Sequence, residues 1–340
     1  MRQRLIALML PLLAFACSSS SKDDVASNAG SGGAGATSSG GASGSTSTGG
    51  TGGSGAVGGN ISLGGAGGGS GGKNGCSKTD FLFVVDSSVS MGQEQTALTA
   101  AFPKFISSIT NATNIKQFHI LVTDTDAETR CTASACAGTP HSTCNNYACN
   151  HVYKGCDATR GAGVIQPTGQ GSSNTICPIA NGLRWMDETQ PNLSDTFSCV
   201  ATLGLAGHPS ERPIESMVAA VSPTLEGPGG CNEGFLRDDA ILVVTFISDD
   251  PNKEDQGTPK EWYDAMVTAK GGNAESIVML GLIPDGAAAT PAKQLHWHQF
   301  IELFGKRGIK GDVEAADYAP FFDNAIAIID ETCDNFVPPS

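Results

Sequence analysis

The chain contains the stretch Asp80-Phe81-Leu82-Phe83-Val84-Val85-Asp86-Ser87-Ser88-Val89-Ser90, in which an apolar run passes directly into an acidic, hydroxyl-rich segment. An uninterrupted apolar run bounded by polar residues is typical of a strand that is buried on both faces. Large apolar residues then recur at helical spacing over 91–111, where Pro103 predicts a kink or a break. A buried strand followed by an amphipathic helix is the repeating unit of α/β proteins.

The same alternation continues toward the end of the chain. Further buried strands are expected over 118–123, 240–248 and 276–283, and helices over 213–222, 259–270, 292–305 and 318–333, with Thr258 as an N-cap. The predicted fold class is therefore α/β: a doubly wound, mostly parallel sheet with helices on both faces. Such sheets bind ligands outside the carboxyl ends of their strands, and two of the expected strands end in acids, at Asp86 and Asp249.

Residues 127–199 interrupt this pattern because they are rich in Cys, Gly, Thr and Asn and show only weak periodicity. We interpret them as an insertion, stapled by disulfides, within one domain that spans residues 76–340. Asp124 and Asp126, which end the second strand just before the insertion, are expected near the carboxyl edge of the sheet.

The chain has 11 cysteines, and setting Cys17 aside leaves an even number that can all pair. An even count favours disulfides in an exported protein. Zinc is the alternative for the cysteines between 131 and 156, but no Cys-x-x-Cys pair occurs there. One specific pair is predicted, Cys76 with Cys333, because it would join the two ends of the domain. The ten candidates are Cys76, Cys131, Cys136, Cys144, Cys149, Cys156, Cys177, Cys199, Cys231 and Cys333.

Residues 1–17 have the pattern of an export signal. Arg2 and Arg4 precede an apolar run over 5–16 that is too short to cross a bilayer but fits the core of a secretory signal. The segment ending at Cys17 resembles a bacterial lipoprotein signal, which implies a lipid on Cys17 and a protein anchored in the cell envelope, in the outer membrane of a Gram-negative bacterium. The alternative is an ordinary cleavage site at Ala14-x-Ala16, which would give a soluble secreted product.

Residues 18–75 are almost wholly Gly, Ser, Ala and Thr, and they hold half of the 44 glycines of the chain. Such a segment cannot bury enough apolar surface to fold, so we expect a flexible linker. The net charge is −14, and no basic run occurs anywhere. An acidic surface repels phosphate backbones, which excludes nucleic acid as a partner and leaves cations, or partners bound through cations.

Asp86, Ser88 and Ser90 form the pattern Asp-x-Ser-x-Ser between the first expected strand and the first expected helix. This pattern resembles the metal-ion-dependent adhesion site of von Willebrand factor A domains, including the I domains of integrins. The resemblance covers about residues 78–335 apart from the insertion. The layout of the whole chain also resembles a group of bacterial exported lipoproteins that carry such a domain.

The resemblance implies that Asp86, Ser88 and Ser90 are cation ligands from a first loop and that Asp249 is the acid of a third loop. The second loop of the family supplies a threonine, which is missing here between Gly204 and Glu211. Ser210 could substitute with a hydroxyl, and Glu211 could substitute with a carboxylate.

Hydroxyls and carboxylates are the oxygen ligands that Mg2+ prefers, and Mn2+ or Ca2+ could occupy the same atoms. In the resembled family the ion is incompletely neutralised and binds an acidic group of a partner. The implied function is therefore cation-dependent binding or adhesion to a protein or extracellular-matrix ligand, without enzymatic activity.

Two other functions stay open. Asp-x-Ser-x-Ser alone is more often a helix N-cap than a metal site. The missing threonine of the second loop supports the alternative of an envelope-assembly scaffold with a degenerate metal site. A hydrolase is less favoured because no Gly-x-Ser-x-Gly elbow occurs in the folded part.

The acidic run from Asp249 to Asp255 suggests a calcium loop, but it lacks the turn glycine at its sixth position, so a solvated loop is favoured.

Overall fold

The computed structural model describes residues 76–112, 115–126, 155–207, 211–250, 255–284 and 295–339. All of these belong to the unit Gly67–Ser340. The expected signal with Cys17, the expected linker, and four of the ten paired-cysteine candidates (Cys131, Cys136, Cys144 and Cys149) lie outside the described residues. Within the described part of the chain, no helix combines the length and the apolar composition that a membrane span requires.

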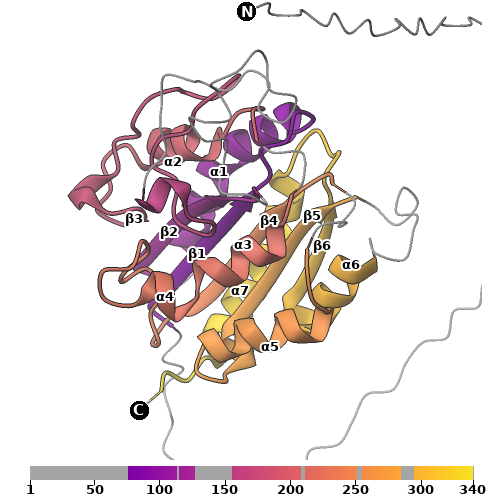
Figure 1. The fold of residues 1–340 in the computed structure, drawn as a ribbon. Helices are drawn as coiled ribbons and strands as arrows, with labels where there is room; N and C mark the ends of the chain where they lie inside the picture. Colours follow the sequence, from indigo (N-terminus) through magenta and orange to yellow (C-terminus); the bar gives the residue numbers. More distant parts are fainter. Residues whose placement is uncertain are drawn as a thin grey trace, which may run out of the picture. The chain divides into compact units, whose positions relative to one another are not determined.

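The protein has a mixed α/β fold built on a six-stranded, mostly parallel sheet (Figure 1). The strand order is β3-β2-β1-β4-β5-β6, and every neighbouring pair is parallel except β2 and β3. The strands are β1 (Lys78–Val85), β2 (Gln117–Asp124), β3 (Met186–Asp187), β4 (Ile241–Ile247), β5 (Ile277–Ile283) and β6 (Gly308–Asp312). The four strands predicted from apolar runs are therefore present, and β1 and β4 lie side by side in the middle of the sheet.

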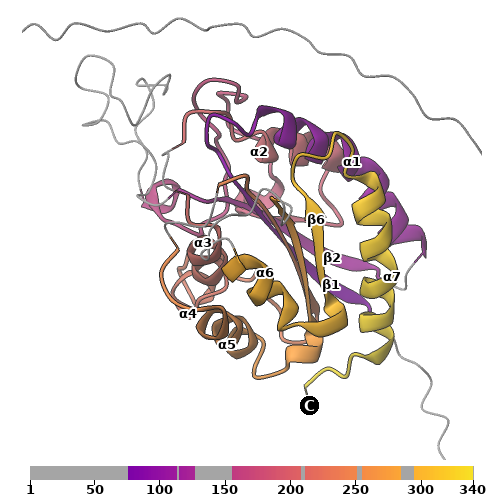
Figure 2. The ribbon, with the colours of Figure 1, turned by 90° about the vertical axis from the view of Figure 1, so that its right-hand side faces the viewer.

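Helices cover both faces of the sheet, as Figure 2 shows. The described helices are α1 (Gly92–Ala112), α2 (Leu193–Ala201), α3 (Pro213–Ala220), α4 (Pro223–Glu226), α5 (Pro259–Ala269), α6 (Leu295–Glu302) and α7 (Ala319–Asn335). Successive side chains of a strand point to opposite faces, so a run that is apolar throughout supplies two cores. Phe81, Phe83 and Val85 of β1 pack into the core under α1, α2 and α7, whereas Leu82 and Val84 pack into the core on the other face.

The sequence predicts a kink or a break at Pro103, and helix α1 runs through Pro103 without a break. Pro103 is exposed, and Phe102 and Phe105 on either side of it are buried against the sheet. The carbonyl that loses its helical hydrogen bond, that of Thr99, belongs to a residue at the partly solvent-exposed side of the helix, where water can replace the missing donor. The expected N-cap of α5 is confirmed: Thr258 and Glu261 form a reciprocal capping box.

The second half of the segment interpreted as an insertion contributes to the main core. It supplies the edge strand β3 and helix α2, neither of which the sequence pattern indicated. Phe197 of α2 is fully buried and stacks on Phe102 of α1, with ring centroids 3.6 Å apart and planes within 6° of parallel. Phe197 also meets the edge of Phe83 of β1 at 4.9 Å. The residues from α2 onward are therefore part of the domain that β1 organises.

Three disulfides join the described cysteines: Cys76–Cys333, Cys156–Cys231 and Cys177–Cys199. The predicted pairing of Cys76 with Cys333 is confirmed, and it joins the residues before β1 to the last turn of α7. Cys76 also donates its backbone N–H to the carbonyl of Cys333 at 3.0 Å. The two ends of the domain are thus fixed to each other by both covalent and hydrogen bonds.

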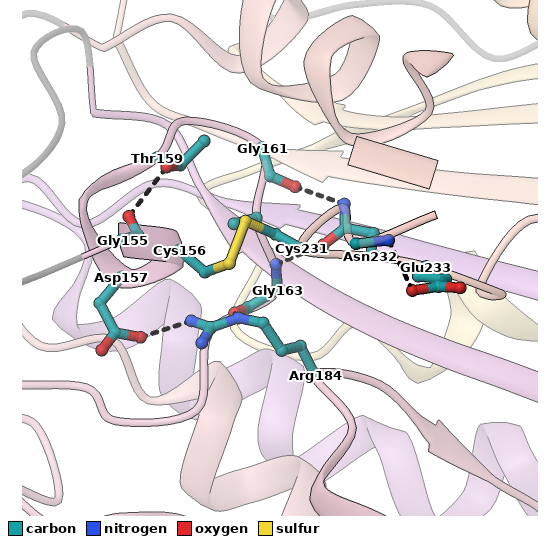
Figure 3. Close-up of a disulfide and its surroundings, with 12 residues drawn as sticks. Gly155, Cys156, Asp157, Thr159, Gly161, Gly163, Arg184, Cys231, Asn232 and Glu233 are labelled. Carbon is teal, nitrogen blue, oxygen red and sulfur yellow. Dashed lines mark hydrogen bonds and ion pairs between the residues drawn. A yellow bond between two sulfur atoms is a disulfide. The ribbon is translucent and has the colours of Figure 1, made fainter. Parts of the chain in front are cut away.

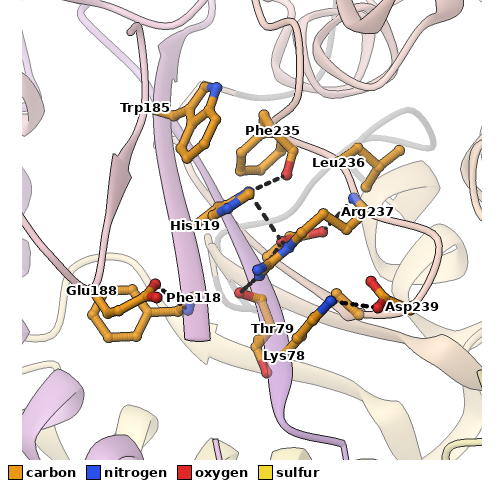
Figure 4. Close-up of polar contacts among 12 residues, drawn as sticks. Lys78, Thr79, Phe118, His119, Trp185, Glu188, Phe235, Leu236, Arg237 and Asp239 are labelled. Carbon is orange, nitrogen blue, oxygen red and sulfur yellow. Dashed lines mark hydrogen bonds and ion pairs between the residues drawn. The ribbon is translucent and has the colours of Figure 1, made fainter. Parts of the chain in front are cut away.

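A set of polar contacts that includes Arg237 and His119 lies at the amino end of the sheet (Figure 4). Asp80 of β1 is fully buried and accepts hydrogen bonds from the backbone and side chain of Arg237 at 2.7 and 2.8 Å. The ring of His119 of β2 packs against Trp185 in a tilted arrangement, and its Nδ1 lies 2.8 Å from the carbonyl oxygen of Phe235, within hydrogen-bond distance. Burial raises the pKa of Asp80 to about 6 despite the nearby Arg237, and burial lowers the pKa of His119 to about 4. These contacts hold the loop before β4 against the sheet.

Candidate functional site

The register of the sheet aligns the ends of β1, β2 and β4 at its carboxyl edge. Val85 of β1 is paired with Asp124 of β2 and with Ile247 of β4. The residues that follow these positions, beginning with Asp86, Thr125 and Ser248, therefore leave the sheet at the same edge. Asp86 extends this alignment, because its backbone N–H donates to the carbonyl of Ile247 at 3.0 Å.

The first loop holds the carboxylate of Asp86 in a fixed orientation. Its Oδ1 accepts the backbone N–H of Ser88 at 2.7 Å, and its Oδ2 accepts the hydroxyl of Ser248 at 2.6 Å. Asp86 is fully buried, whereas Ser88 is half-buried and Ser90 is exposed. The Oγ atoms of Ser88 and Ser90 lie 3.2 Å apart. The loop thus presents two hydroxyls outward above one buried carboxylate.

The third loop follows β4 and reaches the same place. Ser248 is fully buried, and its Oγ also accepts the backbone N–H of Asp250 at 3.2 Å. Asp249 is half-buried and close enough for its negative charge to raise the pKa of Asp86. Because Asp249 directly follows Ser248, which is hydrogen-bonded to Asp86, both acids lie at the carboxyl edge of the sheet.

The second loop, after α2, is fastened to the first by buried polar contacts. The side-chain amide of Gln95 donates to the carbonyls of Asp86 and Gly204 at 2.8 and 3.0 Å, and its oxygen accepts the N–H of Gly204. Gly207 donates its N–H to the carbonyl of Ser87 at 3.0 Å. A Cβ atom at Gly207 would collide with Ser87 and with the carboxylate of Asp126, so this close approach requires glycine.

Glu211 ends the second loop beside Asp126, with which it forms an isolated β-bridge. Its side chain is fully buried, and its Oε2 accepts the hydroxyl of Thr125. Its Oε1 is buried and has no hydrogen-bond partner among the described residues. Ser210, the other candidate for the second loop, lies outside the described residues.

The site contains several buried acidic groups. Burial raises the pKa of Asp86 to about 7, against the hydrogen bonds from Ser248 and Ser88, and the charge of Asp249 adds to the increase. Burial also raises the pKa of Glu211, and the charges of Asp86, Asp126 and Asp124 raise it further. Asp124 and Asp126 are themselves buried, and Asp126 accepts the hydroxyl of Ser87 at 3.1 Å. Buried carboxyl groups at this density favour the binding of a positively charged group at this edge of the sheet.

Three residues of this arrangement were not singled out from the sequence: Ser248, Gln95 and Thr125. Each acts through a partner that is far away along the chain, so no local motif marks it. The residues that were singled out from the first and third loops, Asp86, Ser88, Ser90 and Asp249, lie at the same edge of the sheet.

A small, partly open cavity lies next to the carboxyl end of β2. Asp124, Arg160 and Arg184 are among its lining residues, and the Cys156–Cys231 disulfide borders it (Figure 3). Arg184 is paired with Asp157 at 2.5 Å, and Arg160 is paired with Glu215 at 2.5 Å. Because both guanidinium groups already have acidic partners, we assign no ligand to this cavity.

Asn232 fixes the wall of this cavity to helix α3. Its side chain donates to the carbonyls of Gly161 and Ala220 and accepts the N–H of Gly163, each at 2.9 Å. Gly161 has a φ of +81°, and a Cβ atom there would collide with the backbone of Ala220. The segment that comprises η1 (Gly155–Ala158) and the residues after it is thus held against the domain by the Cys156–Cys231 disulfide and by the hydrogen bonds of Gly161 and Gly163 with Asn232.

Comparisons with known proteins leave the function to be argued from this site. No family model and no curated protein matches the chain. Among solved structures, it is similar to proximal thread matrix protein 1 from the mussel byssus, at 10% sequence identity and a TM-score of 0.38. The match covers 74% of this chain and 48% of that one, so this chain spans about half the length of that protein. A TM-score of this size carries no functional argument.

Proposed function

We propose that this protein is a divalent-cation-dependent binding module with a doubly wound fold of the von Willebrand factor A type. The observation that carries the proposal is the convergence of Asp86, Ser88, Ser90 and Asp249 at the carboxyl edge of the sheet, where α/β proteins bind their ligands. Asp86 comes from the end of β1 and Asp249 follows β4, so a local helix cap does not explain their proximity.

The donor set fits a hard divalent cation. Its atoms are hydroxyl and carboxylate oxygens, which Mg2+, Mn2+ and Ca2+ bind in preference to nitrogen or sulfur. Among the described residues no three His, Cys, Asp or Glu side chains form a metal-binding group, but the proposed set combines two carboxylates with two hydroxyls. The buried carboxyl of Asp86, whose ionised form is disfavoured by lost hydration, would gain a countercharge from a bound cation.

We assign the residues of the site distinct tasks. Asp86 and Asp249 would supply charge to the cation, and Ser88 and Ser90 would supply neutral oxygens on its outer side. Ser248 and the backbone of Ser88 orient the Asp86 carboxylate, and Gln95 fastens the second loop to the first. A cation bound there would attract an acidic side chain of a protein or matrix ligand, which explains how an acidic domain can bind an acidic partner.

The proposed setting is the envelope of a bacterial cell. Export by residues 1–17, a lipid on Cys17 and a flexible linker over 18–75 would anchor the domain in the outer membrane and hold it away from the bilayer. The exposed positions of Ser90 and of Val89, which is 74% exposed, leave the edge open to a large partner.

Selection of displayed peptides tests the proposal. Full-length protein is immobilised and exposed to random phage-displayed peptides in Mg2+, in Ca2+ and in EDTA. We expect enrichment of peptides that contain Asp or Glu in the presence of cation, release of these peptides by EDTA, and no enrichment on Asp86→Ala. Asp264→Ala, which removes an exposed acid of α5, is the matched control and should behave as wild type. Equal enrichment in EDTA, or on Asp86→Ala, would contradict the proposal and favour the scaffold alternative.

A further inference from the structure

We infer that Asp255 and Glu215 are positioning residues of the proposed cation site, because they clamp the end of the loop after β4 to the start of α3. We call this pair the loop clamp. The second loop leads into α3 and the third loop leads into α5, so the clamp fixes the two loops relative to each other. The inference rests on the proposed function and deepens it, since it identifies what holds the loops beside Asp86 in place.

Asp255 caps helix α3 from a distant part of the chain. The N-cap residue of α3 is Arg212, whose guanidinium can only donate hydrogen bonds and therefore cannot cap the N–H groups of the first turn. Asp255 supplies the acceptors instead. Its Oδ1 accepts the backbone N–H of Glu215 at 3.0 Å, and its Oδ2 accepts that of Ile214 at 3.3 Å. A negative group is favourable at the start of a helix, so this carboxylate joins the two segments.

The same carboxylate also contacts helix α6. The indole N–H of Trp297 donates to Oδ2 of Asp255 at 3.0 Å. Trp297 is buried and lies edge-on to Phe246 of β4, with ring centroids 5.9 Å apart. Trp297 and Ile214 belong to the same core cluster. The position of Asp255 is therefore set by α3, by α6 and by the core on this face of the sheet.

Glu215 forms the second half of the clamp. Its Oε1 accepts the backbone N–H of Gln256 at 2.9 Å. Each carboxylate of the pair thus accepts an N–H from the other's segment, because Asp255 accepts the N–H of Glu215. Oε2 of Glu215 accepts a hydrogen bond from the guanidinium of Arg160 at 2.5 Å, which adds the segment after η1 to the same junction.

Hydrogen bonds lead from the clamp to the loop that contains Asp86. Arg160 donates its Nε–H to the carbonyl of Asp126 at 2.9 Å, and the carboxylate of Asp126 accepts the hydroxyl of Ser87 at 3.1 Å. The beginning of the third loop is bonded to Asp86 directly, through the hydroxyl of Ser248. The third loop is therefore fixed at its beginning by Ser248 and at its end by the clamp.

Cation titrations of the full-length protein at constant pH test the inference. Asp255→Asn keeps the shape of the side chain but replaces one acceptor oxygen with a donor, which opposes the N–H groups that it faces. We expect this variant to bind Mg2+ and Ca2+ about threefold or more weakly than wild type, an effect typical of residues that act through a packed network. Asp264→Asn, the same change at an exposed acid of α5, is the matched control and should bind as wild type does.

The indole N–H signal of Trp297 in NMR spectra reports on the clamp directly. The chain has three tryptophans, and Trp297→Phe identifies the signal. Saturating cation should shift this signal in wild type and leave it unmoved in Asp255→Asn, because coupling between two sites is reciprocal. The signal of Trp185 should stay in place in both proteins, since its indole N–H donates to the carbonyl of Glu233 at 3.2 Å, at the amino end of the sheet.

Arg237→Ala separates positioning from general stability. This variant should destabilise the amino end of the sheet and keep the cation affinity of wild type, whereas a loss of affinity equal to that of Asp255→Asn would overturn the inference. Equal affinities of Asp255→Asn and wild type, or a Trp297 signal that cation does not shift in wild type, would also overturn it. Loss of binding in Asp86→Ala would then leave the proposed site intact. A wild type that binds neither ion would overturn both.

Discussion

The hydroxyl of Ser248 donates a hydrogen bond of 2.6 Å to Oδ2 of Asp86, a residue 162 positions earlier in the chain. This bond connects the carboxyl end of β4 to that of β1. With the backbone N–H of Ser88 on Oδ1 at 2.7 Å, it gives each oxygen of the buried carboxylate a donor from a different loop. The orientation of Asp86 is therefore set before any ligand arrives.

Ser248→Ala should weaken cation binding about tenfold, because residues that orient a metal ligand typically contribute 10- to 100-fold, by rough estimate, to affinity. Ca2+ and Mg2+ titrations by calorimetry measure the effect. Ser276→Ala is the matched control, since it removes a buried hydroxyl that bonds the carbonyl of Asn273 at the opposite end of β5. Equal affinities for wild type and Ser248→Ala would show that the bond does not support a cation site.

Removing the Cys76–Cys333 disulfide should cost more stability than removing Cys177–Cys199. The two bonds close loops with sequence separations of 257 and 22 residues, and a longer loop restricts the unfolded chain more. The chain-entropy relation gives a difference of about 2 kcal/mol between the two double Cys→Ser variants. Urea unfolding at constant pH measures both. A smaller loss of unfolding free energy for the Cys76/Cys333 variant than for the Cys177/Cys199 variant would mean that closing the longer loop restricts the unfolded chain little.

Arg237→Ala should destabilise the protein by about 3 kcal/mol, because it leaves the carboxylate of Asp80 buried without its cationic partner. Lys104→Ala removes the exposed ion pair with Asp323 and should cost no more than about 1 kcal/mol. Denaturant unfolding gives both values. Arg237 lies at the amino end of the sheet, so cation affinity should be the same in Arg237→Ala as in wild type. Equal stability losses in the two variants would contradict the structural role assigned to Asp80.

The cation-free protein should lose stability between pH 6.5 and pH 8, and Glu226 should account for part of the loss. Burial raises the pKa of Glu226 from 4.5 to about 8, so its contribution to stability is complete below the lower value and is lost as pH rises through the higher one. Asp255, whose pKa burial raises to about 7, acts in the same direction. His119, with its pKa lowered from 6.5 to about 4, acts in the opposite direction but only below about pH 6.5.

Glu226→Gln should reduce this loss by an amount on the order of 1 kcal/mol, measured by urea unfolding in EDTA at the two pH values. Glu233→Gln, which changes an exposed glutamate that accepts the N–H of Gly229 in the same loop, is the matched control and should keep the difference seen in wild type. A Glu226→Gln variant with the full wild-type loss would show that this carboxyl does not hold its proton in the folded state.

The central strands and most helices could be predicted because their apolar patterns are continuous. Strand β6 could not, since Gly308–Asp312 is a half-exposed edge strand with a single large apolar residue. Helix α2 does carry a usable signal, because Leu193, Phe197 and Val200 repeat at helical spacing, but the surrounding cysteines and glycines concealed it. The cysteine- and glycine-rich composition therefore concealed the apolar periodicity of α2, which places Phe197 and Val200 in the core.

Only part of the candidate site could be predicted, namely the residues that a local sequence pattern marks. Asp86, Ser88 and Ser90 form a motif that is readable in sequence, and a strand that ends in an acid indicated Asp249. The positioning roles of Ser248 and Gln95 depend on which strands and loops are neighbours, information that the order of residues does not contain. Glu211 stood as one of two alternatives, and the β-bridge with Asp126 is the observation that gives it a defined position.

The most direct test of the account is calorimetric titration of Mg2+ and Ca2+ into cation-free, full-length wild type, Asp86→Ala and the control Asp264→Ala. Circular dichroism confirms that all three are folded. The account predicts saturable binding of one ion per chain to wild type and to the control, with matching thermal stabilisation, and no binding to Asp86→Ala. Absence of binding to wild type at millimolar ion, or equal binding by Asp86→Ala, would contradict it.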